Sequence, residues 1–229
     1  MVISYLGKSF VKITQGDLTI AVNPIGKDGA WPSKATKFAS SVALSSLNDE
    51  SYNGFDTVTY NDVAPFSISG PGDYEVKDVT IRGVGSKVTR DGDTLINTSY
   101  TIIVDGITLA FLGPTQNELD ADSRQALMNP DVLFVPIGGG DMLDATKAYK
   151  LAVSLEPLII IPLEWDSKAN PDGSRDARSG DAGFRDGDAA LKKFLKEAGE
   201  EGVAPVDKLT LKRKDLDGKE GDVIVLSYT

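Results

Sequence analysis

The sequence predicts an α/β (α+β) protein in which helices cover β-sheets. The first half of the chain consists mainly of strand-like runs, and the second half alternates helical with strand-like segments. Within the first half, Asp105-Gly106 joins two β runs, and this dipeptide is a strong hairpin signal. Strands followed by β-α-β-α segments favour sheets faced by helices, so these three observations support one fold class.

The strands of the first half are predicted from runs of β-branched and aromatic residues bounded by turn residues. Gly7 follows the first run, and Gly16 lies in the turn between the second and the third. The predicted strands cover residues 3–6, 10–14, 18–22, 42–44, 78–85, 99–104 and 107–113.

Capping and helix-ending residues delimit the helices of the second half. Asn129-Pro130 ends a short helix predicted over 120–128, and Asp144 is the expected N-cap of a helix over 144–155. The remaining predicted elements are a helix over 188–198 and strands over 132–137, 158–162, 208–212 and 222–228.

Length and composition set the wider expectations. We expect a single domain over 1–229, with a mobile surface loop at 166–187, where Asp, Gly, Ser and Arg dominate. Lys and Arg number 24 against 34 Asp and Glu, and this net charge of −10 argues against nucleic acid or an anionic membrane as partner. No apolar run approaches the roughly 20 residues of a membrane span. The first ten residues lack signal-peptide features, so we expect a cytoplasmic protein.

The chain contains no cysteine and no histidine. The absence of cysteine excludes disulfides and thiolate metal sites. Histidine is the commonest ligand of catalytic zinc and the usual general base near neutral pH. Any chemistry of this protein must therefore do without both side chains.

Several motifs, taken in order, resemble the metallo-β-lactamase superfamily. They are "ISYLGKSFVKI", "LTIAVNP", "VALSSLNDES", "GPGDYEV", "AFLGPT", "DVLFVPIGGG" and "LIIIPLEW", which together span roughly residues 1–166. The most similar branch is the Zn-dependent hydrolases that include lactonase-like enzymes. The resemblance implies a four-layer αββα sandwich with a dinuclear metal site at one edge of the sheets.

The family's metal signature, His-x-His-x-Asp-His, matches a stretch without histidine. Two imidazoles two residues apart grip one ion, while the Asp and the last His reach a second ion about 3.5–4 Å away. Here Ser46, Asn48 and Ser51 stand at the histidine positions, and Glu50 stands at the aspartate position. We interpret this loop as a metal-binding loop that has lost its ligands.

The other positions implied by the resemblance have changed as well. Lys8 replaces the histidine of a Gly-His-Ser motif, and Asn23 replaces the aspartate of an Asp-Pro motif. Pro114 stands at the bridging aspartate, Glu164 stands at the late histidine, and residues 86–88 offer no histidine. The candidate pocket residues are therefore Lys8, Asn23, Ser46, Asn48, Asp49, Glu50, Ser51, Pro114 and Glu164, with no metal and no cofactor expected.

Two alternatives concern the charged candidates. Asn48, Asp49, Glu50 and Glu164 carry oxygen ligands that suit a hard cation such as Mg²⁺ or Ca²⁺, but we favour solvated or Lys8-paired carboxylates. Lys8 could act as a nucleophile or an anion anchor. We favour an ion pair of Lys8 with Glu164 or Glu50.

Further alternatives carry less weight. Ser45, Ser46 and Ser51 suggest a serine hydrolase, but the sequence has no nucleophile elbow. Asp141 is expected to be a loop residue, and Gly138–Gly140 are expected to form a sharp turn rather than a phosphate cradle. Trp31 and Trp165 either line a ligand groove or interface, or cover the end of the core.

The sequence therefore supports two hypotheses on function. The first is a non-catalytic pseudoenzyme that serves as a binding or interaction module for an unidentified small molecule or protein. The second is an active hydrolase, lactonase-like or phosphodiesterase-like, that uses a carboxylate-bound ion or no metal. The oligomeric state is open in both.

Overall fold

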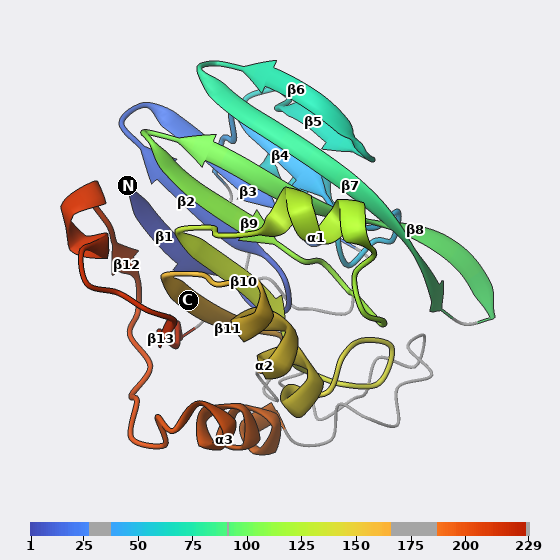
Figure 1. Cartoon of the computed structure of the whole chain (residues 1–229). Helices are drawn as coiled ribbons and strands as arrows, with labels where there is room; N and C mark the ends of the chain where they lie inside the picture. The colour runs from blue at the N-terminus through green and yellow to red at the C-terminus, as the bar shows by residue number, and fades with distance from the viewer. Residues whose placement is uncertain (28–37, 91, 166–186, 228–229) are drawn as a thin grey trace.

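The computed structural model describes residues 1–27, 38–90, 92–165 and 187–227, which form two mixed β-sheets packed face to face (Figure 1). Helices lie on the outer face of the second sheet (Figure 1). The predicted α/β sandwich is confirmed. None of the helices in the described ranges combines the length and hydropathy that a membrane crossing requires.

The first sheet has the strand order β12-β1-β2-β3-β4-β5. Its strands are β1 (Val2–Tyr5), β2 (Val11–Gln15), β3 (Leu18–Val22), β4 (Val42–Ser45), β5 (Phe66–Ser69) and β12 (Leu209–Thr210). The strands β1 to β3 pair antiparallel, whereas β3, β4 and β5 run parallel. Therefore β1, β3 and β4 all end at the same edge of the sheet. The edge strand β5 was not predicted, because its run Phe66–Ser69 contains only two apolar residues.

The second sheet has the order β13-β11-β10-β9-β8-β7-β6. Its strands are β6 (Gly72–Val76), β7 (Val79–Arg90), β8 (Asp93–Val104), β9 (Ile107–Phe111), β10 (Val132–Pro136), β11 (Ile159–Leu163) and β13 (Asp222–Val223). The strands β7 and β8 have 12 residues each and are longer than predicted. Pairing with β6 stops at Gly83 and pairing with β9 stops at Tyr100, so the far end of this hairpin projects past both neighbours (Figure 1).

The helices agree closely with the sequence prediction. They are α1 (Ala121–Leu127), α2 (Ala145–Ser154) and α3 (Gly187–Ala198), with short 3₁₀ helices η1 (Phe55–Val58) and η3 (Arg213–Leu216). The Asp144 carboxylate caps α2 by accepting hydrogen bonds from the backbone N–H groups of Thr146 and Lys147, as expected for an N-cap. The helix α2 packs against β10 and α3.

The outer layer over the first sheet is thin in the described part of the chain. Side chains alternate between the two faces along β3 and β4, so Ala21 and Ala43 point away from the sandwich interior. On this outer face they pack with Phe10, Ile25 and Val58. Val58 belongs to η1, so a 3₁₀ helix takes the place of an α-helix on this side.

Some sequence predictions require correction, and others lie outside the described residues. The strands predicted over 208–212 and 222–228 shrink to two residues each, because β12 and β13 pair only briefly at sheet edges. The predicted loop at 166–187 lies outside the described residues except for Gly187, where α3 begins. Trp31 also lies outside them.

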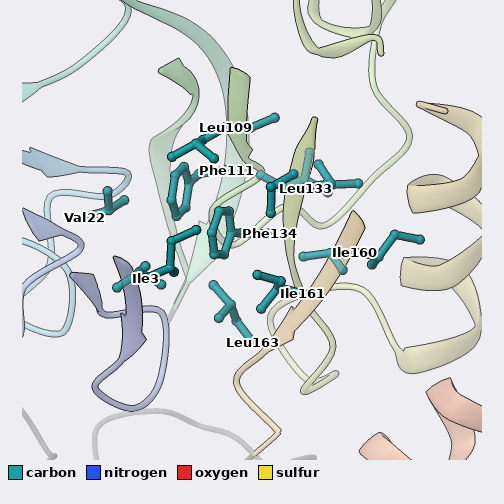
Figure 2. Packing of buried hydrophobic residues seen from close by; sticks show 14 of the residues in the cluster. Ile3, Val22, Leu109, Phe111, Leu133, Phe134, Ile160, Ile161 and Leu163 are labelled. Atoms are coloured by element: carbon teal, nitrogen blue, oxygen red, sulfur yellow. The ribbon is translucent and has the colours of Figure 1, made fainter. Parts of the chain in front are cut away.

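Apolar side chains of both sheets meet in the centre of the sandwich. The rings of Phe111 and Phe134 stack with centroids 4.1 Å apart and planes 3° apart. Figure 2 shows these rings between Ile3 and Val22 of the first sheet and Leu163 of the second. Stacked aromatic rings bury a large area, so this pair contributes strongly to sheet-on-sheet packing.

Replacing Phe134 with alanine should destabilise the protein, because it removes a buried ring and leaves a cavity. We expect a loss of about 3–5 kcal/mol in the free energy of unfolding, measured by denaturant titration. The control is Phe66→Ala on the edge strand, where the side chain is 51% exposed and the change should stay near about 0.5 kcal/mol. Equal losses in the two variants would contradict this view of the core.

Candidate functional site

The candidate residues gather where strands of both sheets end. Lys8 follows β1, Asn23 follows β3 and Glu164 follows β11, each in the left-handed region with φ of 50°, 55° and 57°. Such residues end a strand abruptly and turn the chain. The backbone N–H of Glu164 donates to the carbonyl of Lys8 at 3.1 Å, so the edges of the two sheets are joined at this point.

Glu164 is the centre of a buried hydrogen-bond network. The residue is only 4% exposed. Its Oε1 accepts one hydrogen bond from Ser9 Oγ and another, at 2.8 Å, from Tyr52 Oη. The backbone N–H of Glu164 also donates to Tyr5 Oη at 3.1 Å. Among the described residues, the partners of this carboxylate are thus hydroxyl groups and not the Lys8 ammonium, which corrects the expected Lys8–Glu164 ion pair.

Lys8 instead contacts the loop that follows β4. Its Nζ donates to Ser51 Oγ at 3.4 Å. A role of Lys8 as a nucleophile or an anion anchor, and its pairing with Glu50, stay predictions. The Lys8 carbonyl, which accepts from Tyr5 Oη at 2.7 Å, fixes the turn in which this residue lies.

The loop at 46–51 divides into buried and exposed positions. Ser46 and Ser51 are buried, whereas Asn48 and Glu50 are exposed. The Ser46 N–H donates to Asn23 Oδ1 at 2.7 Å, so two of the predicted site residues bind each other directly. Asn48 Oδ1 accepts from Asn53 at 3.0 Å. The positions that match the family's metal signature therefore differ in their exposure to solvent.

Arg90 is a site residue that the sequence analysis missed. It lies at the far end of the β7–β8 hairpin, with a side chain only 15% exposed. Its Nη1 lies 3.8 Å from Asp49 Oδ1, and its Cζ lies 5.8 Å from the centroid of the Tyr52 ring. The strand predicted over 78–85 stops five residues before Arg90, so no sequence signal placed this guanidinium at the site.

The electrostatics of the site reflect this arrangement. Burial raises the pKa of the Tyr52 hydroxyl well above its ordinary value, and the negative charge of Glu164 raises it further. Burial lowers the pKa of Arg90, but its electrostatic interactions with the acidic groups of Tyr52, Asp49, Glu164 and Asp141 outweigh this effect, so the pKa is raised overall. Tyr52 therefore stays protonated as a donor, and Arg90 stays charged.

Asn97 is a second residue that the sequence analysis missed. Its Nδ2 donates to the Leu112 carbonyl at 3.0 Å and to Ser86 Oγ and Thr115 Oγ1, each at 3.3 Å. A Cβ at Gly113, where φ is 63°, would lie 2.3 Å from Asn97 Oδ1, so this turn requires glycine. The amide thus holds the turn before Pro114, which is buried and has no side-chain donor atom.

Two buried polar atoms of this region have no hydrogen-bond partner among the described residues. They are Ser46 Oγ and Asn97 Oδ1, and both lie within 3.0 Å of the position that a Gly113 Cβ would occupy. Neither atom belongs to a carboxylate or an imidazole. The pair therefore adds polarity to the site without adding a charged metal ligand.

Local structure bears on some of the remaining sequence expectations. Trp165 is buried against Tyr5, with ring centroids 6.3 Å apart, so it covers the core rather than lining a groove. Ser45 Oγ donates to the Leu47 carbonyl at 2.6 Å. Gly139 and Gly140 have φ of 74° and 64°, which confirms the sharp turn.

The residues present do not fit a dinuclear zinc site. Within the described ranges, no group of three Asp or Glu side chains is placed to hold a metal ion. The Glu164 carboxylate is bound by two hydroxyl groups, the Asp49 carboxylate faces Arg90, and the side chain of Pro114 has no donor atom. A divalent cation here would be repelled by the positive charge of Arg90 and would find too few ligands.

Comparison with known proteins agrees with this arrangement of sheets. The sequence profile of the beta-lactamase superfamily domain matches residues 2–164. The chain belongs to this family. Among curated protein sequences, no relative matches the chain.

Similar solved structures share the fold. A protein from Thermotoga maritima, assigned to the Zn-dependent hydrolases of the metallo-beta-lactamase superfamily, has 23% sequence identity and a TM-score of 0.73, over 100% of this chain and 99% of that chain. An isothiocyanate hydrolase from Delia radicum gut bacteria has 9% identity and a TM-score of 0.60, over 93% and 100% of the two chains. At these identities the likeness concerns the fold alone.

The raised pKa of Tyr52 predicts a loss of stability in alkali. In the unfolded chain the hydroxyl releases its proton near its ordinary pKa of about 10, whereas in the folded protein it keeps the proton to higher pH. The unfolded state therefore binds fewer protons above this pH, and stability falls as pH rises through this window. Melting curves should show a smaller alkaline decline for Tyr52→Phe than for wild type, and an unchanged decline for the exposed-residue control Tyr60→Phe.

Proposed function

We propose that this chain is a non-catalytic member of the beta-lactamase superfamily that acts as a binding or interaction module. One observation carries the proposal. The Glu164 carboxylate, at the position of the family's late histidine, is buried and bound by Ser9 and Tyr52. A carboxylate held in this way is satisfied by the protein itself and has no need of a metal ion.

The sequence supports the same proposal independently. All positions that match the family's metal ligands carry other residues, and the chain has no histidine or cysteine with which to build a different zinc site. Loss of a single partner of a metal ligand already reduces affinity about 10–100-fold, so replacement of the whole set removes the site.

The proposal extends to organisation and location. We propose a single domain over 1–229, supported by β12 and β13, which join the C-terminal part of the chain to the first and the second sheet respectively. We also propose a cytoplasmic location. We further propose a ligand or partner other than nucleic acid, and the net charge of −10 supports this second point.

Elemental analysis combined with a substrate screen tests the proposal. The purified protein should contain far less than one metal ion per chain, and Zn²⁺, Mn²⁺ or Mg²⁺ should not raise its melting temperature. Ester, lactone and phosphodiester substrates should not be turned over with or without these ions. Stoichiometric metal, with turnover abolished by Glu50→Ala and Glu164→Ala but not by the exposed control Glu118→Ala, would overturn the proposal.

One contact favours a second candidate, a hydrolase that works without a metal. Ser9 Oγ donates to the Glu164 carboxylate, and a hydroxyl beside a base is the arrangement of an activated nucleophile. Against this candidate, Ser9 is only 1% exposed, so a substrate has little access to its oxygen.

The second candidate predicts that Ser9→Ala abolishes any turnover found in the screen. The matched control is Ser45→Ala, which removes another buried hydroxyl whose hydrogen bond goes to a carbonyl and not to a carboxylate. Turnover that survives Ser9→Ala would exclude Ser9 as a nucleophile.

A further inference from the structure

The poor fit between this site and a metal ion raises the question of how its negative charges are compensated. Glu164 is buried, and Asp49 is half-buried with a side chain 31% exposed. Removing carboxylates from water costs free energy unless positive charge or hydrogen bonds replace the lost solvation. Two hydroxyl groups bind Glu164 but carry no charge.

Arg90 is a cation that lies among these groups. Its guanidinium is 3.8 Å from Asp49 and faces the Tyr52 ring, and the hydroxyl of that ring donates to Glu164. Glu164 and Asp141 also act electrostatically on Arg90. The contacts thus run without interruption from Arg90 through Tyr52 to Glu164.

The hairpin that carries Arg90 is fixed over the site by neutral contacts. Val88 packs with Leu47 and Tyr52 in a small apolar cluster. Next to Arg90, the Thr89 N–H donates to Gln116 Oε1 at 2.8 Å, and Gln116 Nε2 donates to the Thr89 carbonyl at 2.6 Å. These contacts fix the strand next to Arg90, whose own side chain is only 15% exposed.

We propose that Arg90 is a permanent internal cation of this site, which supplies from the chain itself the positive charge that a bound metal would otherwise supply. Arginine suits this role because its guanidinium stays charged at every physiological pH and stacks on aromatic rings. In this arrangement Arg90 compensates Asp49 and Glu164 and couples the hairpin to the loop after β4. The inference rests on the proposed absence of a metal, but its test does not depend on turnover.

A double-mutant cycle tests the inference. Arg90→Met keeps the length of the side chain and removes its charge, so it should lower the melting temperature by roughly 5–10 °C. Adding Glu164→Gln or Asp49→Asn should recover part of this loss, because the uncompensated carboxylate is then removed. Arg90→Lys, which keeps the charge, should fall between wild type and Arg90→Met.

The matched control is Arg82→Met on the same strand. Arg82 lies 3.8 Å from Asp73, the same separation as in the Arg90–Asp49 pair, but its side chain is 61% exposed. Its loss should change the melting temperature by less than about 2 °C.

The outcomes separate this inference from the proposed function. An Arg90→Met protein as stable as wild type overturns the inference. A double variant whose loss in melting temperature equals the sum of the losses of its two single variants also overturns it. If the single variant Arg90→Met does not fold, the two double variants decide. Folding of the double variant with Asp49→Asn or with Glu164→Gln supports the inference. Failure of both double variants to fold overturns it. Bound metal in the wild type overturns the proposed function, whatever the cycle gives.

Discussion

The arrangement of this site depends on the burial of one carboxylate, that of Glu164. A carboxylate in a protein interior must be hydrogen-bonded or paired, because the protein does not solvate it as water does. Ser9, just after β1, and Tyr52, in the segment after β4, both donate to it, and its own position follows β11. Three distant segments must therefore come together before this charge can be buried.

A second layer of contacts surrounds this carboxylate. The long β7–β8 hairpin extends past its neighbours and places Arg90 beside Tyr52 and Asp49. Tyr52 is consequently used twice, since its hydroxyl donates to a carboxylate while its ring faces a cation. An aromatic residue with a polar tip is suited to such a position between an apolar cluster and a charged group.

The family and the site give different information about this protein. The two sheets and the order of their strands belong to the beta-lactamase superfamily, and the core that holds them is apolar and independent of any metal. Activity in such a fold depends on side chains at the edges of the sheets, which change without disturbing the core. Here these positions carry Lys8, Asn23 and Glu164, and each of them makes hydrogen bonds within the protein.

Most of the fold could be predicted from the sequence, because periodicity and turn chemistry are local properties. The Asp105-Gly106 hairpin, the Asp144 cap and the buried runs of β10 and β11 lie where the sequence placed them. The short edge strand β5 escaped prediction, because it has few apolar residues and is completed by its pairing with β4. The absence of histidine and cysteine, which bears most directly on chemistry, is also a property of the sequence alone.

The partners of the site residues were decided only by the tertiary structure. Ser9 and Glu164 are separated by 155 residues and Tyr52 and Glu164 by 112, and no local pattern specifies such pairs. The positions of Arg90 and Asn97 depend on how far the β7–β8 hairpin extends and on how the two sheets are placed against each other. The sequence by itself therefore determined the elements and the available chemical groups, whereas the packing of the sheets decided which groups meet.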